Sequence, residues 1–440
     1  MAGGGDRFGP ALYLGGGLAL VGAAGYAFVA LTGHTLSPAD AAAAASLYLL
    51  VNIIGPGLFS ALEQETSRSV SAELAAGRDP RHVTRNACLL AAAMLVLVVV
   101  VLLAISPVLT GKALAGKWGL FAAVLLSVAT SAAVYVVRGL TGGRQRFTGY
   151  AATLGAEGVA RILPCVVLAA SGVADAVGYA LAFAAGSAFG ALAGLPWLRR
   201  PAAEVTTVDG PVVPVGRMAR ALSLLVGGTL LMLLVMNLAP VVVTPRLADD
   251  AATAAAFASA FVLARVPLFL FAPVQAVLLP SLTRAATRGE LGVVRARLRT
   301  ILLAVAAVGL PGVLASFTVG PWAVQVLFGA QVRLSGMVVG LLGVGTVGLM
   351  VAQVLQPGLV ALGRHKIVTL AWAAGATALV ALLALPGDPL RAGVTAQLAA
   401  SALVVVVMLT SLYRALRTWE SGPSGAGSDR ASGDENVIKR

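Results

Sequence analysis

A succession of long apolar blocks, with few charges inside them, restricts this chain more than any other feature. The segment from Ala87 to Ile105 is an almost unbroken apolar run, and about twenty such residues suffice to cross a bilayer. Hydrophobic residues make up 59% of the chain and charged residues 11%, whereas soluble domains average about 45–50% and about 25%. The sequence therefore predicts an all-α polytopic membrane protein and excludes a soluble enzyme.

The apolar blocks predict about twelve transmembrane helices in two sets of six. The expected spans are 9–31, 40–62, 86–109, 118–139, 149–171, 174–197, 218–243, 252–281, 300–319, 334–358, 366–385 and 393–414. The predicted domains are an N-terminal six-helix lobe at 9–197, a cytoplasmic linker at 198–217, a C-terminal six-helix lobe at 218–415 and a tail at 416–440. The tail is rich in Ser, Gly and charged residues, which predicts disorder in the cytoplasm.

Basic residues indicate the orientation of these spans. Most arginines lie in the loops that follow the even-numbered spans, and the alternate loops carry only Lys112, Lys117, Arg246, Arg333 and Arg391. Short loops rich in Lys and Arg stay on the cytoplasmic side. Both termini are therefore predicted to be cytoplasmic in a bacterial inner membrane, and the net charge of +13 reports orientation and not nucleic-acid binding.

The two sets of spans show signs of an internal repeat. A Gly-Leu pair, a short spacer and a Gly-Arg pair follow the fourth span at 139–144 and recur after the tenth span at 358–364. The second and eighth spans each hold a proline and lead into Arg-bearing segments, 66–85 and 283–299, which we interpret as interfacial amphipathic helices. With six spans per set the repeat is parallel, about an axis along the membrane normal, as in some transporters.

This arrangement resembles the multidrug/oligosaccharidyl-lipid/polysaccharide (MOP) flippase superfamily, which includes the MATE transporters. Within it the chain is most similar to the Wzx-type polysaccharide and O-antigen flippases, and its Ala, Gly, Val and Arg usage suggests a high-GC bacterium. The resemblance covers residues 9 to about 415. It implies two six-helix lobes around a central cavity. It also implies a monomer that flips a polyprenyl-diphosphate-linked oligosaccharide to the outer leaflet by alternating access.

Three ionisable residues lie deep inside predicted spans. Arg161 falls near the middle of the fifth span and Arg265 near the middle of the eighth. A mid-membrane arginine costs about 2.5–3.5 kcal/mol, and its planar fork matches a diphosphate, so both are predicted to hold the diphosphate. Two other interpretations stay open: Arg161 only pairs with Glu157 one turn earlier, and Arg265 caps carbonyls near Pro267. Glu157 is either that charge partner or a site for a coupling ion, H⁺ or Na⁺.

Other polar residues complete the candidate site. The amides expected to bind sugar hydroxyls, or to bond between helices, are Asn52, Asn237, Gln275 and Gln353. The residues expected to form a cytoplasmic gate, or plain solvated helix ends, are Glu63, Glu65, Arg68 and Arg284. Gly186, Gly190 and Gly194 form a stripe for close helix packing within one lobe.

Several absences narrow the function. The sequence has no G-x-x-x-x-G-K-[ST] loop, no catalytic triad, no metal-ligand spacing and no expected cofactor. The alternatives are a MATE-type multidrug/cation antiporter and a nonenzymatic scaffold for a glycan assembly complex with a polymerase or glycosyltransferase. Two mid-membrane arginines against one glutamate favour an anionic ligand, and hence the flippase.

Overall fold

The computed structural model describes residues 9–199, 214–268, 282, 285–286 and 288–420. These residues form thirteen helices and no strand. Twelve helical segments are long and apolar enough to cross a membrane. The all-α class and the twelve spans predicted from the apolar blocks are confirmed. The tail from 421, most of the linker (200–213) and the end of the eighth predicted span (269–281) lie outside the described residues.

The first six helices pack as one group. Their bounds are α1 (Gly9–Thr35), α2 (Pro38–Ala75), α3 (Arg81–Ala113), α4 (Trp118–Gly143), α5 (Phe147–Ala170) and α6 (Ala176–Arg199). Helix α5 packs against α1 and α6, and α4 packs against α2 and α6. Helix α3 is the least buried, and its exposed leucines and valines make a hydrocarbon-facing surface.

The remaining helices form a second group. Their bounds are α7 (Val215–Arg246), α8 (Ala251–Leu263), α10 (Leu291–Thr318), α11 (Gly320–Phe328), α12 (Gly336–Ala361), α13 (His365–Leu383) and α14 (Pro389–Glu420). Helix α12 packs against both α10 and α14, and α13 packs against α14. Helix α7 contacts α2 of the first group as well as α13 and α14, and α8 also contacts α2.

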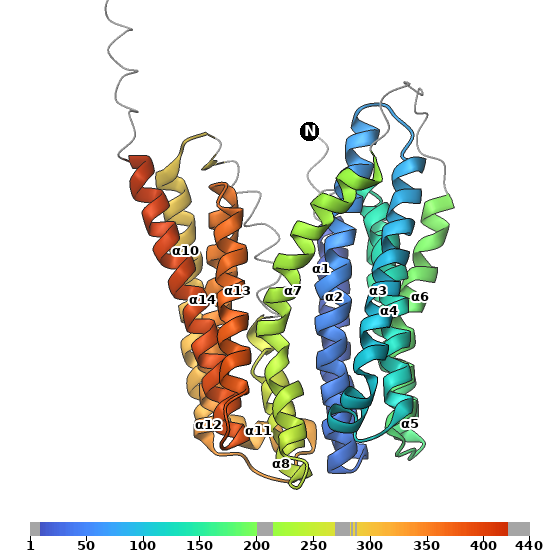
Figure 1. The fold of residues 1–440 in the computed structure, drawn as a ribbon, viewed down its shortest axis with the longest axis vertical. Coiled ribbons are helices and arrows are strands. Elements are labelled where there is room, and N and C mark those ends of the chain that lie inside the picture. The colour runs from blue at the N-terminus through green and yellow to red at the C-terminus, as the bar shows by residue number, and fades with distance from the viewer. Residues whose placement is uncertain (1–8, 200–213, 269–281, 283–284, 287, 421–440) are drawn as a thin grey trace, which may run out of the picture.

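The two groups make a V (Figure 1). Helices α1–α6 stand on one side, α10 and α12–α14 stand on the other, and the groups lie closest at the bottom of the view, near α8 and α11. Both described ends of the chain lie at the top. We call the top the terminal side and the bottom the far side. The Arg-bearing turns after α2, α4 and α12 all lie on the terminal side.

The repeated Gly-Arg turns after α4 and α12 close in the same way. The backbone N–H of Arg146 donates to the carbonyl of Thr141 (2.9 Å), and that of Arg364 donates to the carbonyl of Leu359 (2.8 Å). Both bonds span five residues and satisfy carbonyls that a helix end leaves open. Gly363 has φ 73°, the left-handed conformation that such a turn requires. The two turns share one backbone geometry, but Gln145, with φ 55°, takes the place of Gly363, so the geometry is two residues out of register with the sequence match.

The prediction of an interfacial helix over 66–85 is wrong. Helix α2 continues without a break to Ala75 and ends where Gly77 adopts φ 69°. The extension is packed against protein, because Val70 is buried and closely approaches the backbone of Gly143 on α4. Burial on a neighbouring helix, and not contact with headgroups, accounts for its apolar positions.

Helix α10 also differs from expectation. It begins at Leu291, nine residues before the predicted span, so the second half of the expected interfacial segment 283–299 belongs to the membrane-spanning helix. The short helix α11 was not predicted. It follows α10 directly, begins at Gly320-Pro321 and ends at Gly329, where φ is 65°.

Helix α11 closes the far side of the V against α1. A Cβ built on Gly33 of α1 would lie 2.0 Å from the carbonyl oxygen of Phe328. A Cβ built on Gly329 would in turn lie 2.7 Å from the carbonyl oxygen of Gly33. The two groups therefore meet here backbone to backbone, and only glycine fits on either side.

Candidate functional site

A buried charge cluster joins α4, α5 and α6. The Nη2 of Arg161 lies 2.6 Å from Oε1 of Glu157, and the Nη2 of Arg138 donates to Oε2 of the same carboxylate. Ser187 on α6 donates to Glu157 Oε1 (2.7 Å) and accepts from Arg161 Nη2 (2.9 Å), while Arg138 Nε donates to Thr153 (2.9 Å). One carboxylate is thus shared by two guanidinium groups.

Arg138 was missed as a member of this cluster. Arg138 falls at the end of the predicted span 118–139, where an arginine is expected at the interface, but α4 continues to Gly143 and the Arg138 side chain is buried. Its partner Glu157 is nineteen residues away. The only signal was that a helix extended by one turn would carry Arg138 into the membrane.

The glycine stripe of α6 makes room for this cluster. A Cβ on Gly186 would lie 2.3 Å from Cγ of Arg161, and one on Gly190 would lie 2.8 Å from the carbonyl oxygen of Thr153. Helix α5 therefore lies directly against the stripe, which confirms its predicted role in packing among the first six helices. The pairing of Arg161 with Glu157, one of the two open interpretations, is also present.

Arg265 lies where α8 breaks. The helix ends at Leu263, turns at 264–265 and resumes at 266–268, where Pro267 has no backbone N–H to donate to the preceding turn. Only 6% of Arg265 is exposed. Its guanidinium carbon lies 4.2 Å from the ring centroid of Phe261. Among the described residues, Nη1 of Arg265 has no hydrogen-bond partner and no carboxylate pairs with the side chain.

An aromatic cluster lies between the two arginines. The Arg161 guanidinium lies 4.6 Å from the ring of Phe183, and that ring lies 5.9 Å from the ring of Tyr48 on α2. Tyr48 interacts electrostatically with both Arg161 and Arg265, and Tyr26 on α1 interacts with Arg265. The structure therefore brings arginines from the two helix groups to one cluster of rings.

The predicted gate residues divide into two contacts. Glu65 is buried and accepts two bonds from Arg68, from Nε (2.9 Å) and Nη2 (2.6 Å), although 64% of the Arg68 side chain is exposed. Glu63 turns the other way and accepts a bond of 2.5 Å from the hydroxyl of Tyr150 on α5. Arg284 lies outside the described residues, so the predicted gate stays a prediction.

The predicted amides are distributed over three helices. Asn52 and Asn237 donate to carbonyls one turn earlier in their own helices, those of Tyr48 (2.8 Å) and Leu233 (3.2 Å). Gln353 on α12 contacts the sulfur of Met236 on α7 (3.7 Å). Gln275 lies outside the described residues. Among these hydrogen bonds, that of Asn52 reaches a residue of the aromatic cluster, and the role of the amides stays a prediction.

On the terminal side, arginines hold the end of α6. Arg144 donates to the carbonyl of Leu198 (3.1 Å), and Arg146 donates to the carbonyl of Trp197. Partial burial, together with the neighbouring charge of Arg146, lowers the pKa of Arg144 from its usual value. These bonds fix the α4–α5 turn to the last turn of α6. Cations are favoured at this end of a helix by the helix dipole.

The described residues suit the binding of an anion better than that of a metal. No group of three His, Cys, Asp or Glu among them is placed to hold a metal ion. The centre contains three arginines, Arg138, Arg161 and Arg265, against the carboxylate of Glu157 and the carboxyl group of Glu63, which interacts with Arg138. Cationic side chains therefore outnumber acidic ones in a region where charge is costly.

Comparison with known proteins identifies the fold. No protein-family model and no curated protein matches the sequence. Among solved structures, the chain is similar to an inward-facing multidrug resistance MATE transporter of the MOP superfamily, with a TM-score of 0.71 and 15% identity over 91% of this chain and 96% of that one. It is also similar to the Vibrio cholerae MATE transporter VcmN (TM-score 0.63, 16% identity, 92% and 96%). A third similar structure is the lipid II flippase MurJ, with a TM-score of 0.63 and 11% identity over 93% of this chain and 90% of that one. The chain therefore has the membrane fold of the MATE transporters and of MurJ.

Proposed function

We propose that this protein is a flippase that moves a polyprenyl-diphosphate-linked oligosaccharide from the cytoplasmic to the outer leaflet by alternating access. The observation that carries the proposal is the state of Arg265. It is a buried cation, and among the described residues it has neither a carboxylate partner nor a hydrogen-bond acceptor at Nη1. A diphosphate would supply both the charge and the acceptors.

Energetics favour an anionic ligand at this position. An uncompensated arginine in the membrane costs about 2.5–3.5 kcal/mol, and a desolvated cation–π contact such as that with Phe261 returns about 2 kcal/mol. One charge-assisted hydrogen bond, about 1.5–3 kcal/mol, is enough to offset the remaining cost. Arg161 is different, since it already forms an ion pair with Glu157 and a hydrogen bond with Ser187. We therefore assign the phosphate contact to Arg265 first.

The shape supports loading from the cytoplasm. The Arg-bearing turns lie on the terminal side, and such turns favour the cytoplasmic face. On that assignment the V opens toward the cytoplasm, and the Gly33–Phe328 contact closes the outer side. This is the arrangement needed to accept a lipid-linked precursor before carrying it outward.

The test is depletion of the protein in its native host, followed by mass spectrometry of polyprenyl-diphosphate lipids. If the proposal is correct, one lipid-linked glycan should accumulate on depletion, and re-expression of the protein should clear it. Re-expressed Arg265→Gln should leave the glycan accumulated although the protein reaches the membrane. Arg333→Gln, which alters an exposed arginine between α11 and α12, is the matched control and should clear it. An unchanged lipid profile on depletion refutes the flippase.

A second candidate is a MATE-type antiporter that exports cations, and Glu63 is the observation that favours it. Glu63 is a carboxyl group in a transmembrane helix that accepts a bond from Tyr150 and forms no ion pair among the described residues. Exchange for protons requires a carboxyl that changes charge. Glu157 is unsuited to this because two arginines hold it ionised.

The two candidates separate in a dye assay. If the protein is an antiporter, its expression should lower ethidium accumulation in a pump-deficient host, and Glu63→Gln should abolish that effect. Asp79→Asn, at an exposed carboxylate on the turn after α2, is the control and should retain it. Unchanged ethidium accumulation on expression excludes this candidate for ethidium-like cations.

A further inference from the structure

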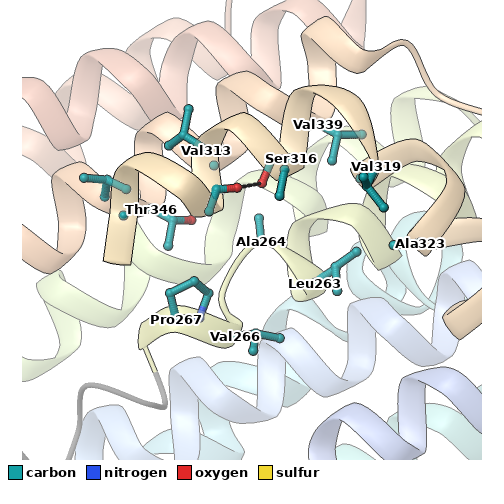
Figure 2. Close-up of a pocket in the computed structure, with 16 residues that line it drawn as sticks. Leu263, Ala264, Val266, Pro267, Val313, Ser316, Val319, Ala323, Val339 and Thr346 are labelled. Carbon is teal, nitrogen blue, oxygen red and sulfur yellow. Dashed lines mark hydrogen bonds between the residues drawn. The ribbon is translucent and has the colours of Figure 1, made fainter. Parts of the chain in front are cut away.

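A pocket of about 230 Å³ lies beside Arg265, among α10, α12 and the broken end of α8. Figure 2 shows Leu263, Ala264, Val266 and Pro267 on one wall and side chains of α10–α12 on the other. Arg265 itself does not line the pocket. Its guanidinium instead lies over Phe261 and interacts with Tyr26 and Tyr48 of the first helix group. The break in α8 thus separates a cationic face from an apolar one.

Missing side chains create the space. Gly309 and Gly312 on α10 and Gly343 on α12 all line the pocket. A Cβ built on Gly312 would have no atom within 4 Å, so this position is open. Gly309 differs, because a Cβ there would lie 2.8 Å from Val347 on α12. Gly309 therefore sets the approach of the two helices, whereas Gly312 faces empty volume.

The lining offers nothing to a polar ligand. Among the described residues that line it, the hydroxyls belong to Ser316 and Thr346. Ser316 donates to the carbonyl of Gly312 (2.8 Å), and Thr346 donates to the carbonyl of Leu342 (3.0 Å). Both donors are satisfied within their own helices. A dry pocket of this kind takes hydrocarbon, as an engineered cavity of about 150 Å³ takes benzene.

The mouth of the pocket adjoins the lipid-facing surface. Val319, which lines the pocket, is half exposed, and Leu310 and Leu314 of the same helix are about two-thirds exposed. A hydrocarbon chain can therefore enter from the bilayer without crossing a polar surface. By proportion with the benzene cavity, the volume suits about nine carbon atoms, close to two isoprene units.

We propose that this pocket binds the first isoprene units of a polyprenyl diphosphate whose phosphate lies on Arg265. The inference rests on the proposed function and adds the part of the site that recognises the lipid chain. Adjacent residues of one turn, 264 to 267, then contact both parts of one amphiphile. The rest of the chain stays in the bilayer, where it gains nothing from protein contact.

Titration calorimetry with the protein in lipid nanodiscs tests this, with inorganic diphosphate and geranyl diphosphate as probes and empty nanodiscs subtracted. Burying most of ten carbons, discounted for the open mouth, predicts that geranyl diphosphate binds at least ~100-fold more tightly than inorganic diphosphate. Gly312→Leu should reduce that advantage to about tenfold or less while leaving inorganic diphosphate unchanged, and Gly312→Ala should fall between.

Gly155→Leu is the matched control. It adds the same side chain on α5, at a glycine with nothing within 4 Å of its Cβ position, and should keep the wild-type advantage. Arg265→Gln should weaken both probes. If Gly312→Leu keeps the full advantage while Arg265→Gln weakens both probes, the pocket inference is wrong and the phosphate site stands. If Arg265→Gln changes neither probe, the phosphate site fails, and with it the inference.

Discussion

Glu157→Gln should be among the most destabilising isosteric changes in this protein. The substitution keeps the shape of the side chain but removes the negative charge that holds Arg138 and Arg161. Both guanidinium groups lie inside the membrane-spanning region, with 5% and 12% of their side chains exposed. Each would lose its ion-pair partner among the described residues.

The magnitude follows from what each arginine keeps. Breaking a buried ion pair costs about 3–5 kcal/mol. Arg138 retains its bond to Thr153, and Arg161 retains its bond to Ser187 and its contact with Phe183, so neither loses every partner. We expect about 3–5 kcal/mol for Glu157→Gln as a whole.

Arg161→Met provides the comparison. It leaves Glu157 paired with Arg138 and bonded to Ser187, so only one charge-assisted bond is lost, about 1.5–3 kcal/mol. The double variant Glu157→Gln/Arg161→Met strands one arginine and not two. It should therefore be more stable than the sum of the single effects predicts, by about 1–3 kcal/mol.

Thermal unfolding of the purified variants in one detergent, followed by fluorescence-detected size exclusion, measures these differences. The expected order of stability is wild type, then Arg161→Met, then Glu157→Gln. Wild-type stability for Glu157→Gln would mean that the carboxyl carries no charge in the folded protein. Equal losses for both single variants, with an additive double variant, would mean that Glu157 is not shared. Either result refutes the reasoning.

Three further changes test other contacts. Gly33→Ala should open the far-side contact with Phe328, because its Cβ would overlap a carbonyl oxygen. Labelling of single cysteines placed on that side should rise severalfold, and unchanged labelling would argue against a closed contact there. Gly186→Ala should cost about 1–3 kcal/mol, since its Cβ would overlap Arg161, and thermal unfolding measures the loss. Arg68→Ala should cost about 1 kcal/mol, because Arg68 is mostly exposed and the buried Glu65 keeps its hydrogen bond from Ser69, and a larger drop in the same assay would show that the ion pair is structural.

Hydropathy was sufficient for the spans but not for their ends. A run of apolar residues is read the same way whether it faces lipid or protein. The segment 66–75 was therefore assigned to the interface, although it continues α2 against α4. The break at Ala264–Arg265 was not predicted either, because its cause is shared by Pro267 and the surrounding packing. Helix α11 was not predicted because its segment is too short for a transmembrane span and too apolar to indicate a loop.

Local spacing found half of the charge cluster. Arg161 and Glu157 are four residues apart on one helix, so their pairing was available from the sequence. Arg138 and Ser187 come from other helices, and only the packing of α4 and α6 on α5 brings them to the carboxylate. The aromatic cluster at Tyr48 depends in the same way on contacts between distant segments.

The two arginines that the sequence singled out now differ in what a conformational change does to them. The partners of Arg161, Glu157 and Ser187, belong to the same helix group and move with it. The neighbours of Arg265 include Tyr26 and Tyr48, on α1 and α2 of the other group. If the groups close on the terminal side and separate on the far side, the surroundings of Arg161 persist, whereas those of Arg265 are reorganised. A ligand held by Arg265 therefore has different affinities in the two states, and such a difference is what transport by alternating access requires.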